Sequence, residues 1–206
     1  MMDSDLVSLG SPRSLLSKGT VVISTRRGQV LSRDTILKDD HLVGDINGDL
    51  EPRICDVPNF RRVKLDGIEI YASAQASAPG TAAVLTILGS GPILSYGGGG
   101  GAAGAGAAPQ QKKTVWINTR EEPLVYLNGK PFTLREQEFP LRNMKRYTGV
   151  DAVRVEQMEA RLKTDIIREA AGYGGLLLVH EEQGLCTSLL SHPPFNPPSL
   201  TIPFSS

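Results

Sequence analysis

TVWINTREEPLVYLNGKPFTLRE, residues 114–136, is the stretch from which the fold can be inferred. It begins with the apolar run 115–117 and turns polar over residues 118–122. A buried strand that delivers polar groups at its carboxyl end has this pattern, and open α/β sheets place ligand sites there. Two further apolar runs flank Asn128-Gly129, a dipeptide typical of tight β-hairpins because both residues accept positive φ. We therefore expect a strand and then a hairpin bordering the functional site.

Upstream, residues 1–18 are Ser-rich and weakly patterned, which predicts a flexible N-terminal arm. Residues 20–24 predict a short strand, and the polar residues 33–41 predict a loop anchored by Ile36 and Leu37. Residues 58–75 alternate apolar and polar positions around Asp66-Gly67, as a hairpin does. Residues 79–88 then suit a helix.

Downstream, the Gly/Ala tract 97–108 has no bulky side chain to bury and predicts a disordered surface insertion. Apolar residues at helical spacing predict a long helix within 149–175, with Glu159–Lys163 and Arg161–Asp165 as exposed i,i+4 pairs. Residues 176–180 predict a buried strand, expected to run parallel to 115–117.

The order strand, turn, strand, helix, strand indicates an α/β domain over residues 19–182, with a central, mostly parallel sheet and flanking helices. From residue 183 to 206 the chain is rich in proline and serine and has no sustained period. We expect this tail to lie outside the packed domain.

Composition excludes several classes of protein. Lys+Arg and Asp+Glu number 22 each in 206 residues, so no global basic field favours nucleic acid. Two cysteines, Cys55 and Cys186, are too few for a disulfide framework. No secretory leader and no run long enough to span a membrane is evident, which predicts a cytoplasmic, cytosolic protein.

Cys55 and Arg61 form a Cys-x5-Arg string, the spacing of a cysteine-phosphatase loop. Such a loop needs successive backbone N–H groups that point at one anion and a following helix. Here Asp56 adds a carboxylate, Pro58 lacks an N–H, and a hairpin is expected next. We therefore assign no catalytic role to Cys55.

No other catalytic pattern emerges. Glu121 and Glu122 are adjacent and face opposite ways in extended backbone, so they do not form an acid/base pair. His41, His180 and His192 lack ligand spacing, so we predict neither a metal site nor a cofactor. The candidate anion-binding residues, for which surface salt bridges are the alternative, are Arg61, Arg62, Arg120, Lys130 and Arg135.

Several strings carry a family resemblance. They are RRGQVLSRDTILKDDH (26–41), PNFRRV (58–63), IYASAQ (70–75), VWINTREEPLVYLNGKPFTLRE (115–136), VEQMEARLKTDI (155–166) and YGGLLLVHEE (173–182). Together they resemble one repeat of paladin and the related tyrosine-phosphatase-like inositol phosphatases, a phytase-like branch of the cysteine phosphatases.

The resemblance implies a tyrosine-phosphatase-like fold and phosphomonoester hydrolysis by a cysteine nucleophile and an aspartate acid. In the family both residues follow the segment similar to 173–182, and no position here matches either of them. We therefore expect an incomplete and inactive repeat, from a truncated or mis-spliced gene model. Its implied ligand is an inositol phosphate or a phosphoprotein. The alternative is a regulatory pseudophosphatase module that binds a phosphorylated ligand without cleaving it.

Overall fold

The computed structural model describes residues 18–40, 54–91, 112–181 and 184–189, the last without side chains. The Gly/Ala tract, nearly all of the N-terminal arm and residues 190–206 lie outside the described residues, so their predictions remain predictions. The chain divides into two compact units. Unit 1 comprises 1–42 and 119–201, and unit 2 comprises 43–118 and 202–206.

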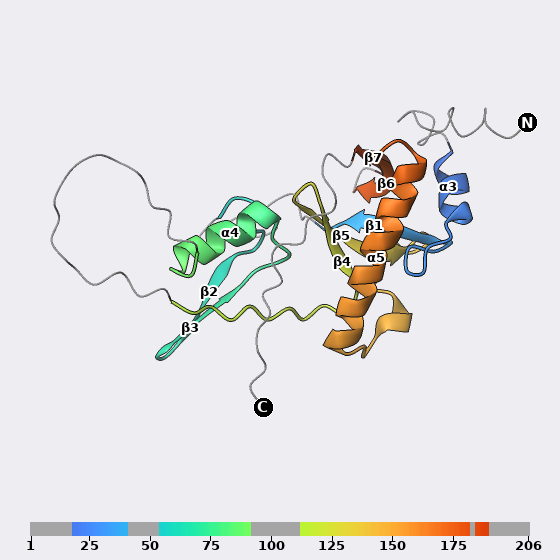
Figure 1. The fold of residues 1–206 in the computed structure, drawn as a ribbon. Helices are drawn as coiled ribbons and strands as arrows, with labels where there is room; N and C mark the ends of the chain where they lie inside the picture. Colours follow the sequence, from blue (N-terminus) through green and yellow to red (C-terminus); the bar gives the residue numbers. More distant parts are fainter. Residues whose placement is uncertain (1–17, 41–53, 92–111, 182–183, 190–206) are drawn as a thin grey trace, which may run out of the picture. The chain divides into compact units, whose positions relative to one another are not determined.

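Unit 1 contains a mixed five-stranded sheet, which makes the fold α/β (Figure 1). The strands follow the order β4-β5-β1-β6-β7. Only β1 and β6 pair in parallel, whereas β1/β5, β4/β5 and β6/β7 are antiparallel. Their bounds are β4 Leu124–Leu127, β5 Lys130–Glu136, β1 Thr35–Asp39, β6 Leu176–Glu181 and β7 Gly184–Leu189.

The expectation of a mostly parallel sheet is therefore wrong for the described residues. β6 takes β1 as its parallel neighbour, with Lys38 opposite His180, and not residues 115–117. Residues 115–117 form no strand, and Val115 and Ile117 are 68% and 79% exposed. The sheet also continues through β7, beyond the expected domain boundary at residue 183.

Two sequence predictions near the N-terminus are also corrected. Residues 20–24, expected as a strand, belong to helix α3 (Gly19–Thr25). Val22 and Ile23 of this apolar run are buried, as suits a helix that packs through one side. The expected loop 33–41 contains β1, although Ile36 and Leu37 are buried as predicted. Because β1 is a central strand with both faces buried, its sequence lacks the apolar–polar alternation of a strand with one face in solvent.

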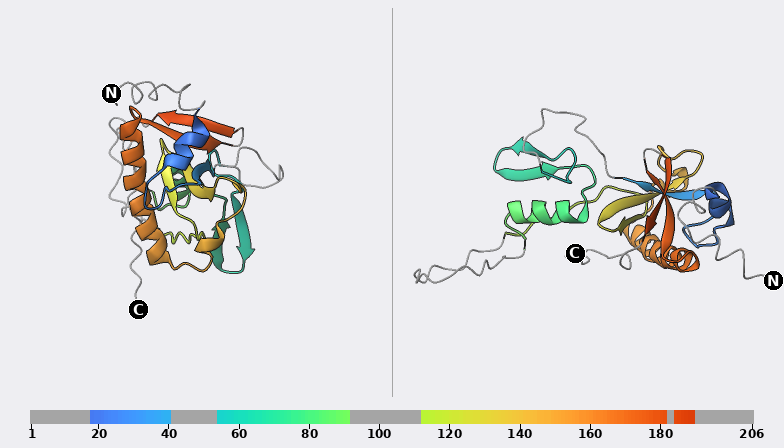
Figure 2. Two further views of the ribbon diagram at one scale, coloured as in Figure 1. Left: turned by 90° about the vertical axis from the view of Figure 1, so that its right-hand side faces the viewer. Right: turned by 90° about the horizontal axis from the view of Figure 1, so that it is seen from above.

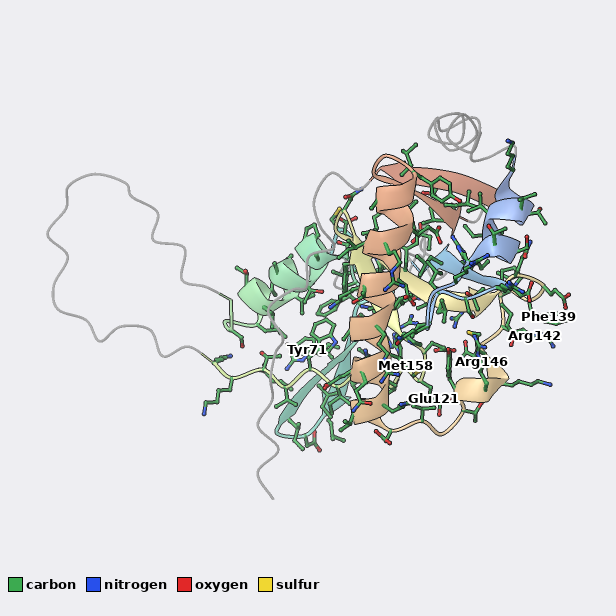
Figure 3. The ribbon with its side chains drawn as sticks, turned by 45° about the vertical axis from the view of Figure 1, so that its right-hand side comes forward. Tyr71, Glu121, Phe139, Arg142, Arg146 and Met158 are labelled. Carbon is green, nitrogen blue, oxygen red and sulfur yellow. The ribbon has the colours of Figure 1, made fainter. Side chains whose placement is uncertain are left out.

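The 21-residue helix α5 (Ala152–Gly172) covers one face of this sheet (Figure 2). Asp151 caps its N-terminus by accepting a hydrogen bond of 2.8 Å from the N–H of Arg154. Met158, Leu162 and Ile166, one helical turn apart, pack into the main core, and Met158 is labelled in Figure 3. Sheet residues in the same core include Leu37, Leu134 and Leu177.

Helix α3 packs on the opposite face of the sheet. Its residues Val22 and Ile23 form a second cluster with Ile36, Leu176 and Leu178. Because strand side chains alternate, Ile36 and Leu37 enter different clusters. Each face of the central strands is thus buried under a helix.

The connection between β5 and α5 carries two stacked cation–aromatic pairs (Figure 3). The guanidinium of Arg142 lies 3.7 Å from the centre of the Phe139 ring. In the 3-10 helix η1 (Lys145–Tyr147), Arg146 lies 5.1 Å from the centre of the Tyr147 ring. These contacts order an exposed segment that has little core of its own.

In its described residues, unit 2 contains a β-hairpin and one helix, as the sequence predicts. β2 (Arg61–Leu65) and β3 (Ile68–Ala72) pair around Asp66-Gly67. α4 (Ala78–Ile87) begins at Ser77, whose side chain accepts a 3.0 Å hydrogen bond from the N–H of Gly80. A small core of Val57, Phe60, Ala76 and Val84 is flanked by partly buried residues that include Tyr71 and Trp116.

Candidate functional site

Arg120 lies just before β4 and reaches a carboxylate from a distant part of the chain. Its Nη2 donates to Oδ2 of Asp40, the residue that follows β1. The two side chains are 22% and 20% exposed, so the ion pair is largely shielded from water. Asp40 is held beside β5, because its N–H donates to the carbonyl of Pro131 at 3.0 Å. The pair therefore has a fixed place next to the sheet.

A second ion pair lies across strands in the same unit. Nη1 of Arg135, on β5, is 2.9 Å from Oε1 of Glu122. Their side chains are 9% and 3% exposed. The N–H of Leu134 donates to the carbonyl of Pro123 at 3.3 Å, which continues the β4/β5 register and sets Glu122 opposite Arg135. Because the pair is buried, removing either partner would leave the other as an uncompensated buried charge, which is strongly destabilising.

The two ion pairs interact and form one arginine–carboxylate cluster, Arg120, Asp40, Arg135 and Glu122. Burial lowers the pKa of Arg120 most, and the positive charge of Arg135 lowers that pKa further, while Glu122 raises it. Arg120 remains charged at neutral pH, because guanidinium does not deprotonate in proteins. Both cations already face a carboxylate, so an added anion is attracted to Arg120 where it displaces Asp40.

One buried hydroxyl accompanies the cluster. Thr133, which precedes Arg135 by two residues on β5, shares its face of the sheet. Thr133 is 1% exposed, and its Oγ1 has no hydrogen-bond partner among the residues that the structure describes. A buried hydroxyl without a partner costs about 1–3 kcal/mol, and at 1% exposure Thr133 is closed to a ligand from solvent.

The other three candidate anion-binding residues are elsewhere. Lys130 is exposed beside the tight turn, where Asn128 and Gly129 have φ of 51° and 83° as the sequence predicted. Arg61 and Arg62 belong to unit 2, where Arg61 donates to the carbonyl of Asn59 and Arg62 lies 3.7 Å from Glu69. For Arg62, the alternative of a surface salt bridge holds.

Glu121 and Glu122 contact different partners, as expected for neighbours in extended backbone. Oε1 of Glu121 accepts a 2.9 Å hydrogen bond from the N–H of Gly149, whereas Glu122 pairs with Arg135. Neither carboxylate is placed to exchange a proton with the other.

The segment around Cys55 does not form a phosphate loop. Cys55 is exposed, and a bridge between Ile54 and Val57 closes the backbone around it into a tight turn. Asp56 in this turn has φ of 60°, and the chain continues into strand β2, not into a helix. Without a helix N-terminus the loop lacks the dipole that a phosphoryl group needs.

Histidine and metal chemistry find no support in the described part of the chain. His180 lies near the end of β6, where burial and then the positive charge of Lys38 lower its pKa. No group of three His, Cys, Asp or Glu side chains is placed to hold a metal ion in the described residues. His41 and His192 lie outside them.

One buried and one partly buried carboxylate of α5 were assigned to exposed pairs from the sequence. Asp165 is 4% exposed, and its Oδ2 accepts hydrogen bonds from the N–H groups of Val30 and Leu31 at 2.7 and 3.1 Å. It therefore does not form an exposed pair with Arg161. A signal was present, because Asp165 lies three residues after Leu162 on the apolar stripe of the helix.

Glu159 is the partly buried carboxylate, and its charge interacts with that of Lys163, its predicted partner. Its Oε1 accepts a 3.0 Å hydrogen bond from the N–H of Leu124 at the start of β4. Burial raises its pKa, while that hydrogen bond and the charge of Lys163 lower it. Glu159 thus connects α5 to β4, the strand that begins shortly after Arg120 and Glu122.

Residues 117–191 match the model of the PTP-like phytase family, described as inositol hexakisphosphate. The match covers less than half of the chain and includes Arg120, Glu122 and Arg135. It also continues beyond residue 182, where the sequence resemblance was expected to end. No curated protein and no solved structure matches the chain. Within the described residues, no helix is both long and apolar enough to cross a membrane.

Proposed function

We propose that this chain contributes a phosphate-binding wall to a paladin-like phosphatase repeat. The single observation that carries the proposal is the arginine–carboxylate cluster, which lies within or directly against the segment similar to PTP-like phytases. In the complete protein, the activity would be hydrolysis of a phosphomonoester on an inositol phosphate or a phosphoprotein. The residues present here bind and orient the phosphate group.

Arg120 is the residue that meets the ligand. It is more exposed than Arg135, and its partner Asp40 is partly exposed as well. A phosphate group replaces Asp40 as the acceptor, because guanidinium binds two phosphate oxygens in a fork. Arg135 keeps its ion pair with Glu122, since that pair is almost fully buried. Its positive charge contributes to the electrostatic potential at the phosphate without contacting the ligand. Binding is therefore an exchange of one anion for another at Arg120.

This exchange predicts opposite effects from the two partners of the ion pair. Arg120→Ala removes the fork and should weaken binding of inositol hexakisphosphate at least about tenfold. Asp40→Asn removes the competing charge and should strengthen binding by a few fold. Isothermal titration calorimetry of the full chain measures both, and affinity should fall steeply as salt is raised.

Arg161→Ala is the matched control, because it removes the same charge from an exposed position on α5. Its affinity should stay within about twofold of the unaltered chain, since screened surface charges contribute little. Equal losses for Arg120→Ala and Arg161→Ala would show nonspecific attraction to a polyanion, and the proposed site would then be wrong.

The 206 residues alone should release no phosphate. A cysteine phosphatase needs a thiolate at the base of a loop of N–H donors, and Cys55 lies in an exposed turn that leads into a strand. Release from inositol hexakisphosphate or a phosphotyrosine peptide is expected at the level of a protein-free blank. Turnover that disappears in Cys55→Ser would overturn this proposal.

The second candidate function is a regulatory pseudophosphatase module. The observation that favours it is that both arginines of the cluster are balanced by carboxylates, an arrangement suited to reversible binding. The two proposed functions predict different coding sequence downstream of this chain. A strand followed by a Cys-x5-Arg string encoded there supports the phosphatase repeat, whereas a confirmed transcript without one supports the regulatory module.

A further inference from the structure

The hairpin of unit 2 exposes an apolar face. Val63 pairs with Ile70 and Leu65 with Ile68, so these four side chains lie on the same face. They are 39–55% exposed, and every residue of β2 is exposed. Figure 3 labels Tyr71, which belongs to the other face and stacks on Phe60 of the small core, with ring centres 5.6 Å apart. Tyr71 thus packs against the small core, while the apolar face of the hairpin is exposed.

The outer backbone edge of β2 pairs with no strand in the part of the chain that the structure describes. Among the described residues β2 pairs with β3 alone, in a two-stranded sheet. The two-residue turn makes Leu65 and Ile68 a hydrogen-bonded pair, so the alternation directs the N–H and C=O groups of Arg62 and Lys64 away from β3. An isolated two-stranded hairpin is marginally stable in water, and a third strand stabilises it.

Charge decides which strand fits this edge. β2 carries Arg61, Arg62 and Lys64 within five residues. Arg62 and Lys64 share a face with Glu69 of β3, whose carboxylate lies 3.7 Å from Arg62 and 3.8 Å from Lys112. Two copies of β2 side by side would juxtapose these cations, which disfavours self-pairing. An incoming strand with carboxylates opposite Arg62 and Lys64 is attracted.

We propose that β2 binds an extended peptide in which acidic and apolar residues alternate, added as a third strand at its open edge. Apolar residues of the peptide extend the face formed by Val63, Leu65, Ile68 and Ile70, while its acidic residues meet Arg62 and Lys64. Main-chain hydrogen bonds supply affinity and the side chains supply register. Four half-exposed side chains are too small an area for a stable dimer, which needs about 800 Å² per partner.

The probe is a fluorescein-labelled, end-capped peptide of five Glu-Val repeats, titrated into the full chain and followed by fluorescence anisotropy. A Lys-Val peptide of the same length is the matched control, because it has the same strand preference and the opposite charge. We expect the Glu-Val peptide to bind at least about tenfold more tightly. Its binding should also protect the amides of Arg62 and Lys64 from hydrogen exchange.

Two variants of one residue separate charge from backbone pairing. Lys64→Gln removes the cation alone, and Lys64→Pro also removes the outward N–H without breaking a bond to β3. Lys64→Pro should weaken binding of the Glu-Val peptide several fold more than Lys64→Gln does. The circular dichroism spectra of both variants should match that of the unaltered chain. Equal effects of the two variants, or equal binding of the two peptides, would overturn strand addition. If the chain dimerises with rising concentration in the absence of peptide, and Lys64→Pro abolishes this, the partner of β2 is a second copy of the chain and the peptide proposal is wrong.

Discussion

Arg26→Met is expected to lower the free energy of unfolding of unit 1 by about 3–5 kcal/mol, the cost of breaking a buried charge pair from one side. Arg26 is 5% exposed, and its Nε and Nη2 donate to the two carboxylate oxygens of Glu169 at 2.8 Å each. Its Nη1 also donates to the carbonyl of Thr35, and its Nη2 to that of Leu178. One side chain thus connects α3, α5 and the two parallel strands of the sheet. Methionine leaves the Glu169 carboxylate and two buried carbonyls without these donors.

Urea unfolding followed by far-ultraviolet circular dichroism measures this loss, since α5 dominates the helical signal. Arg168→Met is the matched control, because the Arg168 side chain is 65% exposed and contacts Asp165 only at 3.4 Å. Its effect should stay below about 1 kcal/mol. A similar small loss for Arg26→Met would mean that the buried network contributes nothing beyond a surface pair.

The double variant Arg26→Met/Glu169→Met sharpens the same prediction. Removing both charges eliminates the stranded carboxylate, so part of the stability lost in Arg26→Met should return. Recovery should be incomplete, since the carbonyls of Thr35 and Leu178 still lack their donor. Losses that simply add would indicate that Arg26 and Glu169 act independently.

Features predicted correctly from the sequence are those that local chemistry specifies. The Asn128-Gly129 and Asp66-Gly67 hairpins follow from residues that tolerate positive φ, and α5 follows from its apolar spacing. β1 was missed because its burial on both faces depends on β5 and β6, which come about a hundred residues later or more. α3 was misassigned because a five-residue apolar run fits a helix and a strand equally well.

Two of the five candidate anion-binding residues lie in the arginine–carboxylate cluster, and their role there stays a prediction. Arg120 and Arg135 were selected as anion binders by charge and position, and the structure brings them together. Asp40, the partner of Arg120, lies 80 residues away in the sequence, and no spacing rule connects them. The same reason hid the role of Arg26, whose partner Glu169 is 143 residues away.

Gly28→Ala is expected to destabilise unit 1 by about 3–4 kcal/mol, because a methyl group has no room there and a hydrogen-bonded loop must move to admit it. A Cβ at Gly28 would lie 2.4 Å from the carbonyl oxygen of Leu31 and 2.6 Å from the carboxyl group of Asp165. Both neighbours are fixed: the N–H of Gly28 donates to that carbonyl, and Asp165 accepts from Val30 and Leu31. The added carbon therefore separates the loop 26–32 from α5.

Gly172→Ala is the matched control for this substitution, since a Cβ at Gly172 meets nothing within 4 Å and the residue ends α5 without a positive φ. It should stabilise the chain by about 0.5–1 kcal/mol, the usual gain of alanine over glycine in a helix. Hydrogen exchange locates the damage, because Gly28→Ala should release the amides of Val30 and Leu31 while those of β4 remain protected. Unchanged protection of Val30 and Leu31 in a destabilised variant would contradict the mechanism, since the contact that the methyl group must break is the one between these amides and Asp165.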